Sequence, residues 1–392
     1  MTALRGRLPE PAVGAGGVAP ETAGSPDADC PGADCPGADC PGADCPGVDR
    51  PGADGPGADG PGVDRPGASR TGDAKRRTGD GKHRTGDGPW RRGRFVAVAA
   101  VLLALTMLGH TRVPHGFGNP GSLLETFLPW LGAAVPALLV LAAVRRSATA
   151  ALAVLLPAVV WCSLFGGTVM DKRSGGGDVT VVSHNVHDRN PDPGGTARAL
   201  VASGADLVAL EELSPSTAPD YGRVLDRSYP HHAVLGTVGL WSKYPLRDVR
   251  PIPIMPWTRA LRATAETPKG PLAVYTAHLA SVRVHPGGGF ATATRDEAAE
   301  KFAAAVRAER LPRLVVVGDF NGTTDDTALR PLTGQLRSAQ QEAGDGFGFT
   351  WPASFPVARI DQILVKGVTP ASSWTLPRTG SDHLPVAATL SL

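Results

Sequence analysis

The chain has 392 residues, of which 49 are glycine and 37 are proline, and its formal net charge is +2. Glycine and proline are concentrated in the first ninety residues, so this part of the chain lacks the apolar side chains that a folded core requires. From Asp178 to the end, acidic and basic residues are equal in number. This balance argues against a strongly basic nucleic-acid-binding face, although it leaves room for a local basic groove.

Residues 1–90 consist of low-complexity repeats. Pentapeptides related to Pro-Gly-Ala-Asp-Cys run from about Asp27 to Gly67, and heptads that begin with Arg-Thr-Gly-Asp follow. Because large apolar residues are scarce, nothing offsets the chain entropy lost on folding, and we predict disorder. The five-residue spacing of the cysteines is not a usual zinc pattern, so we interpret them as products of repeat expansion, with a tail of reactive thiols as the alternative. These cysteines are Cys30, Cys35, Cys40 and Cys45.

Residues 91–171 contain three apolar runs, at Phe95–Gly109, Thr126–Val144 and Ala148–Met170. The last two are long enough to cross about 30 Å of hydrocarbon, and the first is marginal in length. We therefore predict three transmembrane helices in a multi-pass protein of the cell membrane. Arginines precede the first run and separate the second from the third, which places both points on the cytoplasmic side. Three crossings then leave the C-terminal region on the extracytoplasmic side.

Residues 172–177 form a glycine-rich linker, and residues 178–392 are enough for one domain with a sizeable core. Short apolar runs rich in β-branched residues alternate there with two helical patterns and with polar loops. This mixture indicates an α/β fold, a layered β-sandwich flanked by helices. We expect strands at 178–186, 206–212, 233–242, 271–279, 313–320, 359–366 and 384–391, and helices at 194–204 and 293–310.

Four of the apolar runs stop abruptly on polar side chains. The runs end at Asn185, at Glu211-Glu212, at His278 and at Asp319-Phe-Asn321. A buried strand explains each run but not its polar end. Because layered α/β proteins gather polar groups at strand ends into one crevice, we expect these carboxylates, carboxamides and imidazoles to converge on a hydrolytic metal site.

The order of these motifs resembles the endonuclease/exonuclease/phosphatase superfamily, whose members include pancreatic-type deoxyribonuclease, apurinic endonucleases, bacterial sphingomyelinases and inositol-polyphosphate phosphatases. The resemblance covers nearly all of residues 178–392. It implies a deoxyribonuclease-I-like fold and hydrolysis of phosphoesters with a divalent cation. The matching motifs are Asn185, Glu211-Glu212, Thr276-Ala-His278, Gly318-Asp-Phe-Asn321, Arg359-Ile-Asp361 and Ser381-Asp-His383.

The motifs supply candidates for both metal binding and proton transfer. Glu212 and Asn185 offer hard oxygen ligands suited to Mg²⁺ or Mn²⁺, and Asp382 is expected to assist them. We expect His383 to act as the general base and Asp361 to fix its tautomer, as in other carboxylate–histidine pairs.

The resemblance also implies roles for three further residues. Asp319 orients water or the leaving group, Asn321 donates a hydrogen bond to the phosphoryl oxygen, and His278 donates a second hydrogen bond or a proton. The chain departs from the family where Glu211 stands in place of the usual glutamine, which we expect to add negative charge at the metal. A second departure is His187, where some nucleases carry aspartate.

The leading hypothesis is a membrane-tethered, divalent-metal-dependent phosphoester hydrolase of the phosphodiesterase or nuclease type. Its substrate is either nucleic acid or a phospholipid or sphingolipid head group, and the sequence does not separate the two. Its other expected partner is the lipid bilayer, and no obligate protein partner is evident. The alternative of another class is a non-catalytic, membrane-anchored binding protein that keeps the fold. That alternative predicts loss of catalytic residues, whereas the motif residues are all present.

Overall fold

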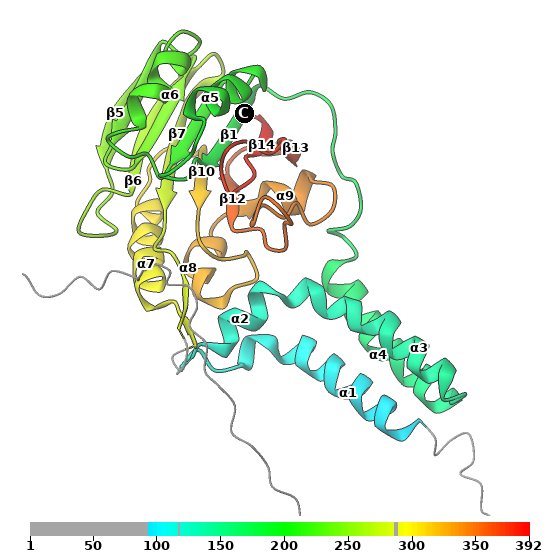
Figure 1. The fold of residues 1–392 in the computed structure, drawn as a ribbon. Helices are drawn as coiled ribbons and strands as arrows, with labels where there is room; N and C mark the ends of the chain where they lie inside the picture. Colours follow the sequence, from blue (N-terminus) through cyan, green and yellow to red (C-terminus); the bar gives the residue numbers. More distant parts are fainter. Residues whose placement is uncertain (1–92, 117, 286–288) are drawn as a thin grey trace, which may run out of the picture. The chain divides into compact units, whose positions relative to one another are not determined.

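The computed structural model describes residues 93–116, 118–285 and 289–392 (Figure 1). The predictions for the repeats of residues 1–90 and for their four cysteines lie outside the described residues. The described residues from Gly93 to Leu392 belong to one compact unit. Within it, apolar helices precede a region of mixed strands and helices that begins at Val179.

Two helices of the first region have the length and the apolar composition that a membrane crossing requires. They are α1 (Arg94–Gly109), which continues as a short 3-10 turn to Arg112, and α4 (Ala148–Phe165). Large apolar side chains such as Leu102 on α1 and Leu152 on α4 remain exposed to the surroundings of the chain. Such exposure is unusual for a helix in water and ordinary for one in lipid.

The second predicted crossing, Thr126–Val144, begins at a bend in the chain. Helix α2 (Pro120–Thr126) and the following Leu128–Val144 segment, which comprises η2 (Leu128–Ala133) and α3 (Ala134–Val144), meet at a bend of 67°. The bend lies at Phe127, just before Pro129, and proline has no backbone N–H with which to continue an α-helix. The described residues therefore hold two candidate crossings, or three if the bent pair counts as one.

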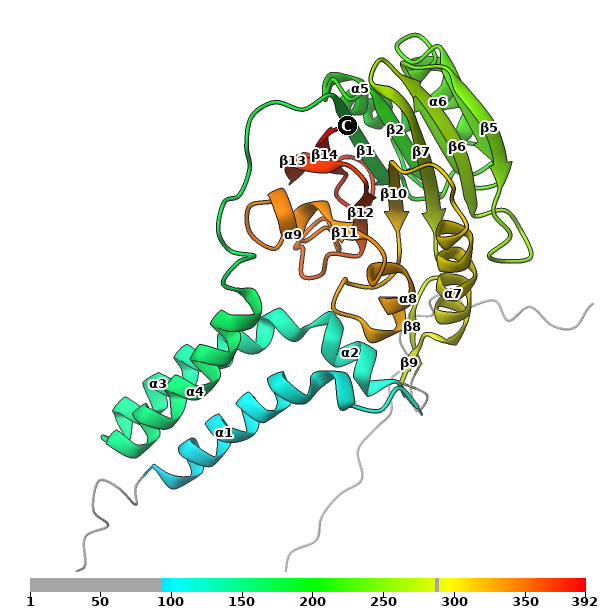
Figure 2. The ribbon, with the colours of Figure 1, turned by 180° about the vertical axis from the view of Figure 1, so that it is seen from behind.

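The region from Val179 onward contains two six-stranded mixed sheets (Figures 1 and 2). Strands of both sheets contribute apolar side chains to one shared core, so the sheets pack face to face. The first sheet has the order β13 (Thr369–Thr375), β14 (Val386–Ser391), β1 (Val179–Asn185), β2 (Leu207–Glu211), β4 (Val238–Ser242), β3 (His231–Leu235). The second has the order β11 (Arg337–Ser338), β12 (Asp361–Lys366), β10 (Leu314–Asp319), β7 (Gly270–His278), β6 (Ala260–Thr267), β5 (Leu246–Pro251).

Helices cover the outer face of each sheet. Helices α5 (Pro193–Ala202) and α6 (Ala218–Leu225) pack on the first sheet, and α7 (Ala293–Arg307) and α8 (Arg330–Thr333) pack on the second. This arrangement confirms the predicted α/β layered sandwich of the deoxyribonuclease-I type. The remaining elements are η3 (Thr327–Leu329), α9 (Ala339–Ala343) and the hairpin of β8 (Arg283–His285) and β9 (Gly289–Ala291).

The structure corrects one detail of the sequence interpretation. The strand expected at 233–242 is a hairpin of two strands, because Gly236 takes a φ of 63° and turns the chain between them. The glycine-rich linker contacts the sandwich, since the Lys172 N–H donates to Gly344 O and the Ser174 N–H donates to Ala371 O. From Val179 onward, the elements that were not predicted include strands β5, β6, β8, β9, β11 and β13 and helices α6, α8 and α9.

Candidate active site

The strand register brings the predicted polar residues to one edge of the two sheets. Parallel β1 and β2 place Asn185 beside Glu211, and parallel β7 and β10 place His278 beside Asp319. Antiparallel β12 places Asp361 opposite Asp319. A cavity of about 870 Å³ opens at this edge, and six of the eight predicted site residues line it, namely Glu212, His278, Asp319, Asn321, Asp382 and His383. Asn185 and Asp361 are buried directly behind them.

His383 and Asp361 form the predicted carboxylate–histidine pair. Nδ1 of His383 lies 2.9 Å from Oδ2 of Asp361, and Nε2 points to Asp319, 3.8 Å from its Oδ2. Burial opposes the imidazolium charge, but the carboxylates of Asp361 and Asp319 outweigh it and raise the pKa of His383. The loop before the histidine is held by Ser381, which accepts a hydrogen bond from the His383 N–H and donates one to Asn185 O.

Asp319 is the buried centre of the cluster. Its Oδ2 accepts a hydrogen bond of 3.0 Å from the Asn185 carboxamide, and its Oδ1 accepts one of 2.8 Å from the Asn321 N–H. Burial raises the pKa of Asp319 above the ordinary aspartate value, and the charge of His383 opposes that rise. The carboxyl group is therefore poised to share a proton with the His383 imidazole.

His278 lies between Glu212 and Asp319. Its Nε2 is 3.4 Å from Oε1 of Glu212 and 3.6 Å from Oδ2 of Asp319. Burial, the Arg259 guanidinium and His383 all lower the pKa of His278, which favours the neutral ring with one N–H available to donate. Arg259 contacts this imidazole, donates from Nε to His278 O at 3.1 Å, and itself lines the cavity.

The remaining cavity carboxylates gather around His187. Its Nδ1 lies 3.7 Å from Oε2 of Glu212, 3.5 Å from Oδ1 of Asp382 and 3.9 Å from Oδ1 of Asp188, and all three carboxylates are at least partly exposed. Asn185 is one layer deeper, since its Oδ1 accepts the His187 N–H at 3.0 Å. Carboxylate oxygens that face a cavity fit a hard divalent cation, which prefers oxygen ligands and keeps several waters. The structure thus brings Glu212 and Asp382 together and places Asn185 behind them.

Three cavity residues have left-handed backbone conformations that non-glycine residues seldom adopt. The φ angles are 59° for His187, 59° for Glu212 and 47° for Asn321. Such strain persists where the surrounding structure requires a particular side-chain direction, and it is concentrated at functional sites. In the Gly-Asp-Phe-Asn motif the glycine is also required by packing, because a Cβ on Gly318 would lie 1.8 Å from Ala277 O.

The expectation that Glu211 adds negative charge at the metal is wrong. Its side chain is fully buried and accepts a hydrogen bond of 2.9 Å from Ser183 Oγ. Burial raises the pKa of Glu211 well above its ordinary value and so favours its neutral form. Of the two adjacent glutamates, only Glu212 faces the cavity.

Sequence reasoning missed two groups of cavity residues. Arg259 follows no recognisable motif, and nothing in its local sequence connects it to His278. The second group comes from helix α2 and the residue after it, where Leu123, Thr126 and Phe127 line the same cavity. The apolar run that begins at Thr126 was visible in the sequence, whereas the position of α2 beside the strand ends was not.

Comparisons with known proteins agree with this architecture. Residues 182–383 match the model of the Endonuclease/Exonuclease/phosphatase family. The mannosyl-6-phosphatase of Bacteroides thetaiotaomicron is 17% identical, with 55% of this chain and 100% of that chain covered and a TM-score of 0.45. A magnesium-bound Staphylococcus aureus beta toxin mutant is 16% identical, with 55% of this chain and 100% of that chain covered and a TM-score of 0.45. A Bacteroides vulgatus endonuclease/exonuclease/phosphatase is 18% identical, with 55% of this chain and 98% of that chain covered and a TM-score of 0.46. A comparison with curated proteins found no match.

Proposed function

The chain belongs to the endonuclease/exonuclease/phosphatase family and is a phosphoester hydrolase. We propose that it uses the His383–Asp361 pair to activate water and that its apolar helices anchor it in a membrane. The observation that carries the proposal is the geometry of His383. Its Nδ1 is fixed by Asp361 at 2.9 Å, and its Nε2 points to Asp319 at the cavity shared with Glu212. A base held by one nitrogen and open at the other is the arrangement that proton abstraction from water requires.

Each remaining predicted residue has a matching task in this proposal. Asp319 orients the attacking water or the leaving oxygen, because it lies within 4 Å of both His383 and His278. Neutral His278 donates a hydrogen bond to a phosphoryl oxygen, Asn321 is placed to donate another, and Arg259 adds a positive charge at the same wall.

The metal ligands we propose are Glu212 and Asp382, with Asn185 behind them. A Mg²⁺ or Mn²⁺ ion held there would supply positive charge against the phosphate oxygens. The position of both carboxylates in the lining of the cavity supports this assignment. Members of the family use divalent metals, whereas the choice between Mg²⁺ and Mn²⁺ is part of the proposal.

The domain division that we propose follows the sequence: repeats at 1–90, a membrane region at 91–171, a linker at 172–177 and the hydrolase domain at 178–392. The hydrolase domain then faces the extracytoplasmic side. Protease added to intact cells should remove this domain while the membrane stays closed. Digestion only after the cells are broken would show that the domain faces the cytoplasm.

The catalytic proposal is tested with the purified full-length chain in lipid nanodiscs. The substrates are bis-p-nitrophenyl phosphate, plasmid DNA and sphingomyelin, each with Mg²⁺ and with Mn²⁺. We expect hydrolysis in the wild type and a loss of about two or more decades in His383→Ala. The matched control is His232→Ala, an exposed histidine on β3 that does not line the cavity. Absence of turnover on every substrate would favour the non-catalytic binding protein.

A further inference from the structure

Helix α2, which belongs to the apolar N-terminal region, forms one wall of the active-site cavity. Leu123 and Phe127 line the cavity together with Glu212, Asp319 and His383. Both apolar side chains are partly exposed, Leu123 by 42% and Phe127 by 36%. Because both side chains are partly exposed, a role in the buried core does not explain why they are apolar.

Further apolar side chains extend this wall around the mouth of the cavity. Trp257 and Trp351 line it and are 54% and 38% exposed, and Phe290 of β9 lies among them. The cavity thus has a charged floor, built from strand ends, and an apolar rim. A phosphate group fits the floor, and a hydrocarbon chain fits the rim.

A buried ionic network holds α2 in place on the domain. Oγ of Ser122, on α2, donates to the Asp326 carboxylate at 3.0 Å and accepts from Arg295 Nη2 at 3.1 Å. Arg295 in turn donates to Asp326 at 2.7 Å, and none of these three side chains is exposed by more than 1%. Moving α2 away would leave the Arg295–Asp326 pair with an unsatisfied partner in the interior, which is costly.

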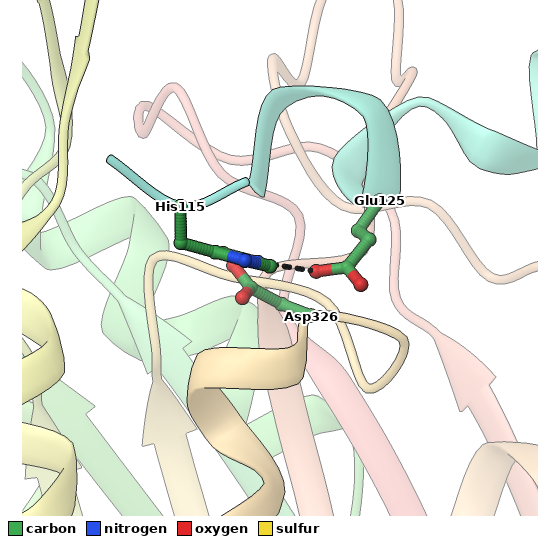
Figure 3. Close-up of side chains that lie close together, drawn as sticks. All are labelled: His115, Glu125 and Asp326. Atoms are coloured by element: carbon green, nitrogen blue, oxygen red, sulfur yellow. Dashed lines mark hydrogen bonds and ion pairs between the residues drawn. The ribbon is translucent and has the colours of Figure 1, made fainter. Parts of the chain in front are cut away.

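A second set of contacts surrounds the fully buried Glu125 near the end of α2. Its Oε2 accepts a hydrogen bond of 2.8 Å from the Thr327 N–H and lies 3.2 Å from His115 Nε2. Figure 3 shows the His115 imidazole directed at Glu125, with Asp326 beside both. Helix α2 lies beside η3 and β9, and the Phe290 N–H donates to Gly118 O at 2.9 Å. The wall is therefore fixed by side chains of α2 and by the backbone that precedes it.

We propose that α2 is a working part of the active site and that Leu123 and Phe127 select phosphoesters that carry a hydrocarbon chain next to the phosphate. The inference rests on the proposed function, since the phosphate of such a substrate lies against His383 and Asp319. The hydrocarbon chain of the substrate enters from the bilayer, because α2 leads directly into the apolar Leu128–Val144 segment of the protein. An amphiphilic phosphoester is then held by its head on the strand ends and by its tail on α2.

The test measures how inhibition by alkyl phosphates depends on chain length. Inhibition constants of ethyl, butyl, hexyl and octyl phosphate are determined against hydrolysis of bis-p-nitrophenyl phosphate, with the Mg²⁺-loaded full-length chain in nanodiscs. A fully buried methylene improves binding about fourfold, so partial burial on an open wall should give at least about a tenfold gain from ethyl to octyl. An equal constant for all four inhibitors would overturn the inference.

The variant that carries the test is the double substitution Leu123→Ala with Phe127→Ala. We expect the constant for octyl phosphate to rise at least about five times more than that for ethyl phosphate, because only the longer chain reaches the wall. The matched control is Leu139→Ala with Leu141→Ala, two exposed leucines of α3 that do not line the cavity. Octyl phosphate partitions into the bilayer in the same way with this control, so a difference between the two double variants reports on the cavity wall. The conservative variant Phe127→Leu should retain most of the chain-length gain. A gain that survives in the double variant would contradict the role of α2.

Two additional measurements separate the possible failures. Calorimetric titration of the Mg²⁺-loaded protein with ethyl and octyl phosphate gives the ratio of their affinities without turnover, so the inference can fail or succeed independently of catalysis.

The route by which the hydrocarbon chain reaches the site is tested with dodecyl phosphate in nanodiscs of increasing lipid content. Inhibition that follows the mole fraction of dodecyl phosphate in the bilayer supports delivery from the membrane. Inhibition that follows its aqueous concentration would contradict it.

Discussion

His383 and Asp319 face each other across the floor of the cavity, with 3.8 Å between Nε2 and Oδ2. They come from different sheets, since Asp319 ends β10 and His383 lies just before β14. Both groups have raised pKa values, and their protonation states depend on each other. The catalytic floor is therefore built by the packing of two sheets, not by either sheet alone.

This relationship predicts the effect of removing the charge behind His383. In Asp361→Asn the side chain keeps its shape but loses the carboxylate that raises the pKa of His383 most. The pKa of the imidazole should fall, so the acidic limb of the kcat profile should move to lower pH. We also expect kcat to decrease by about two decades, because a carboxamide can hold the wrong tautomer of the ring.

The pH–rate profiles of wild type and Asp361→Asn, measured with bis-p-nitrophenyl phosphate, check this prediction. Asp226→Asn serves as the control, since Asp226 contacts His232 on the outer strand β3 and does not line the cavity. A lower kcat with an unmoved acidic limb would mean that Asp361 only positions the ring.

The site also predicts a separation between metal affinity and turnover. Glu212→Gln keeps the size of the side chain but removes one of the three cavity carboxylates near His187, which are Asp188, Glu212 and Asp382. We expect the Mg²⁺ concentration for half-maximal activity to rise at least about tenfold, because a neutral carboxamide is a weaker ligand for a hard cation. Activity in EDTA should be lost and should return on addition of Mg²⁺ or Mn²⁺.

The control for the metal titration is Asp220→Asn, a partly exposed carboxylate of α6 that does not line the cavity. Its Mg²⁺ dependence should match that of the wild type. An unchanged Mg²⁺ dependence in Glu212→Gln would remove Glu212 from the set of metal ligands.

Much of this site could be predicted because its residues lie at the ends of apolar strands. Asn185, His278 and Asp319 each follow a run whose burial is visible in the sequence, and strand register then determines which of them become neighbours. The raised pKa of Glu211 could not be predicted, since it depends on burial, whereas Glu211 and Glu212 are adjacent and chemically identical in the sequence.

The α2 wall could not be predicted for a related reason. Phe127 belongs to the apolar run Thr126–Val144, which the sequence predicts to be a membrane helix, and Leu123 lies just before that run. Their position beside the site depends on contacts with residues about two hundred positions later, such as Ser122 with Asp326 and Glu125 with Thr327. Local sequence patterns carry no information on contacts at that separation.

Packing around the Gly-Asp-Phe-Asn motif predicts a large effect of a small change. Gly318 has a φ of 140°, and a Cβ there would lie 1.8 Å from Ala277 O of the neighbouring strand. Gly318→Ala should therefore destabilise the fold by about 3 kcal/mol or more, since backbone strain and overpacking add. Gly175→Ala is the control, because no atom lies within 4 Å of its Cβ position. Urea unfolding followed by tryptophan fluorescence measures both, and similar midpoints for the two variants would contradict the prediction.

The buried ion pair of Glu309 and Arg262 predicts how stability depends on pH on the far side of the second sheet. Burial opposes ionisation of Glu309, but hydrogen bonds from Arg262, from the Leu311 N–H and from Tyr275 outweigh it and lower the pKa from 4.5 to about 2. Both partners of the pair are 5% exposed. A carboxyl group with a lowered pKa stabilises the fold fully above pH 4.5, and this contribution is lost as the pH falls from 4.5 towards 2.

Glu309→Gln should accordingly lower the free energy of unfolding by about 1–3 kcal/mol at pH 7, and the difference from the wild type should shrink as the pH approaches 3. Thermal unfolding of both proteins between pH 7 and pH 3 measures it. In the control, Glu297→Gln, the glutamate pairs with Lys301 on the exposed face of α7, and solvent screens that pair at every pH. A constant difference between Glu309→Gln and the wild type over this range would mean that the carboxylate charge does not contribute, because a loss of packing alone has no dependence on protonation.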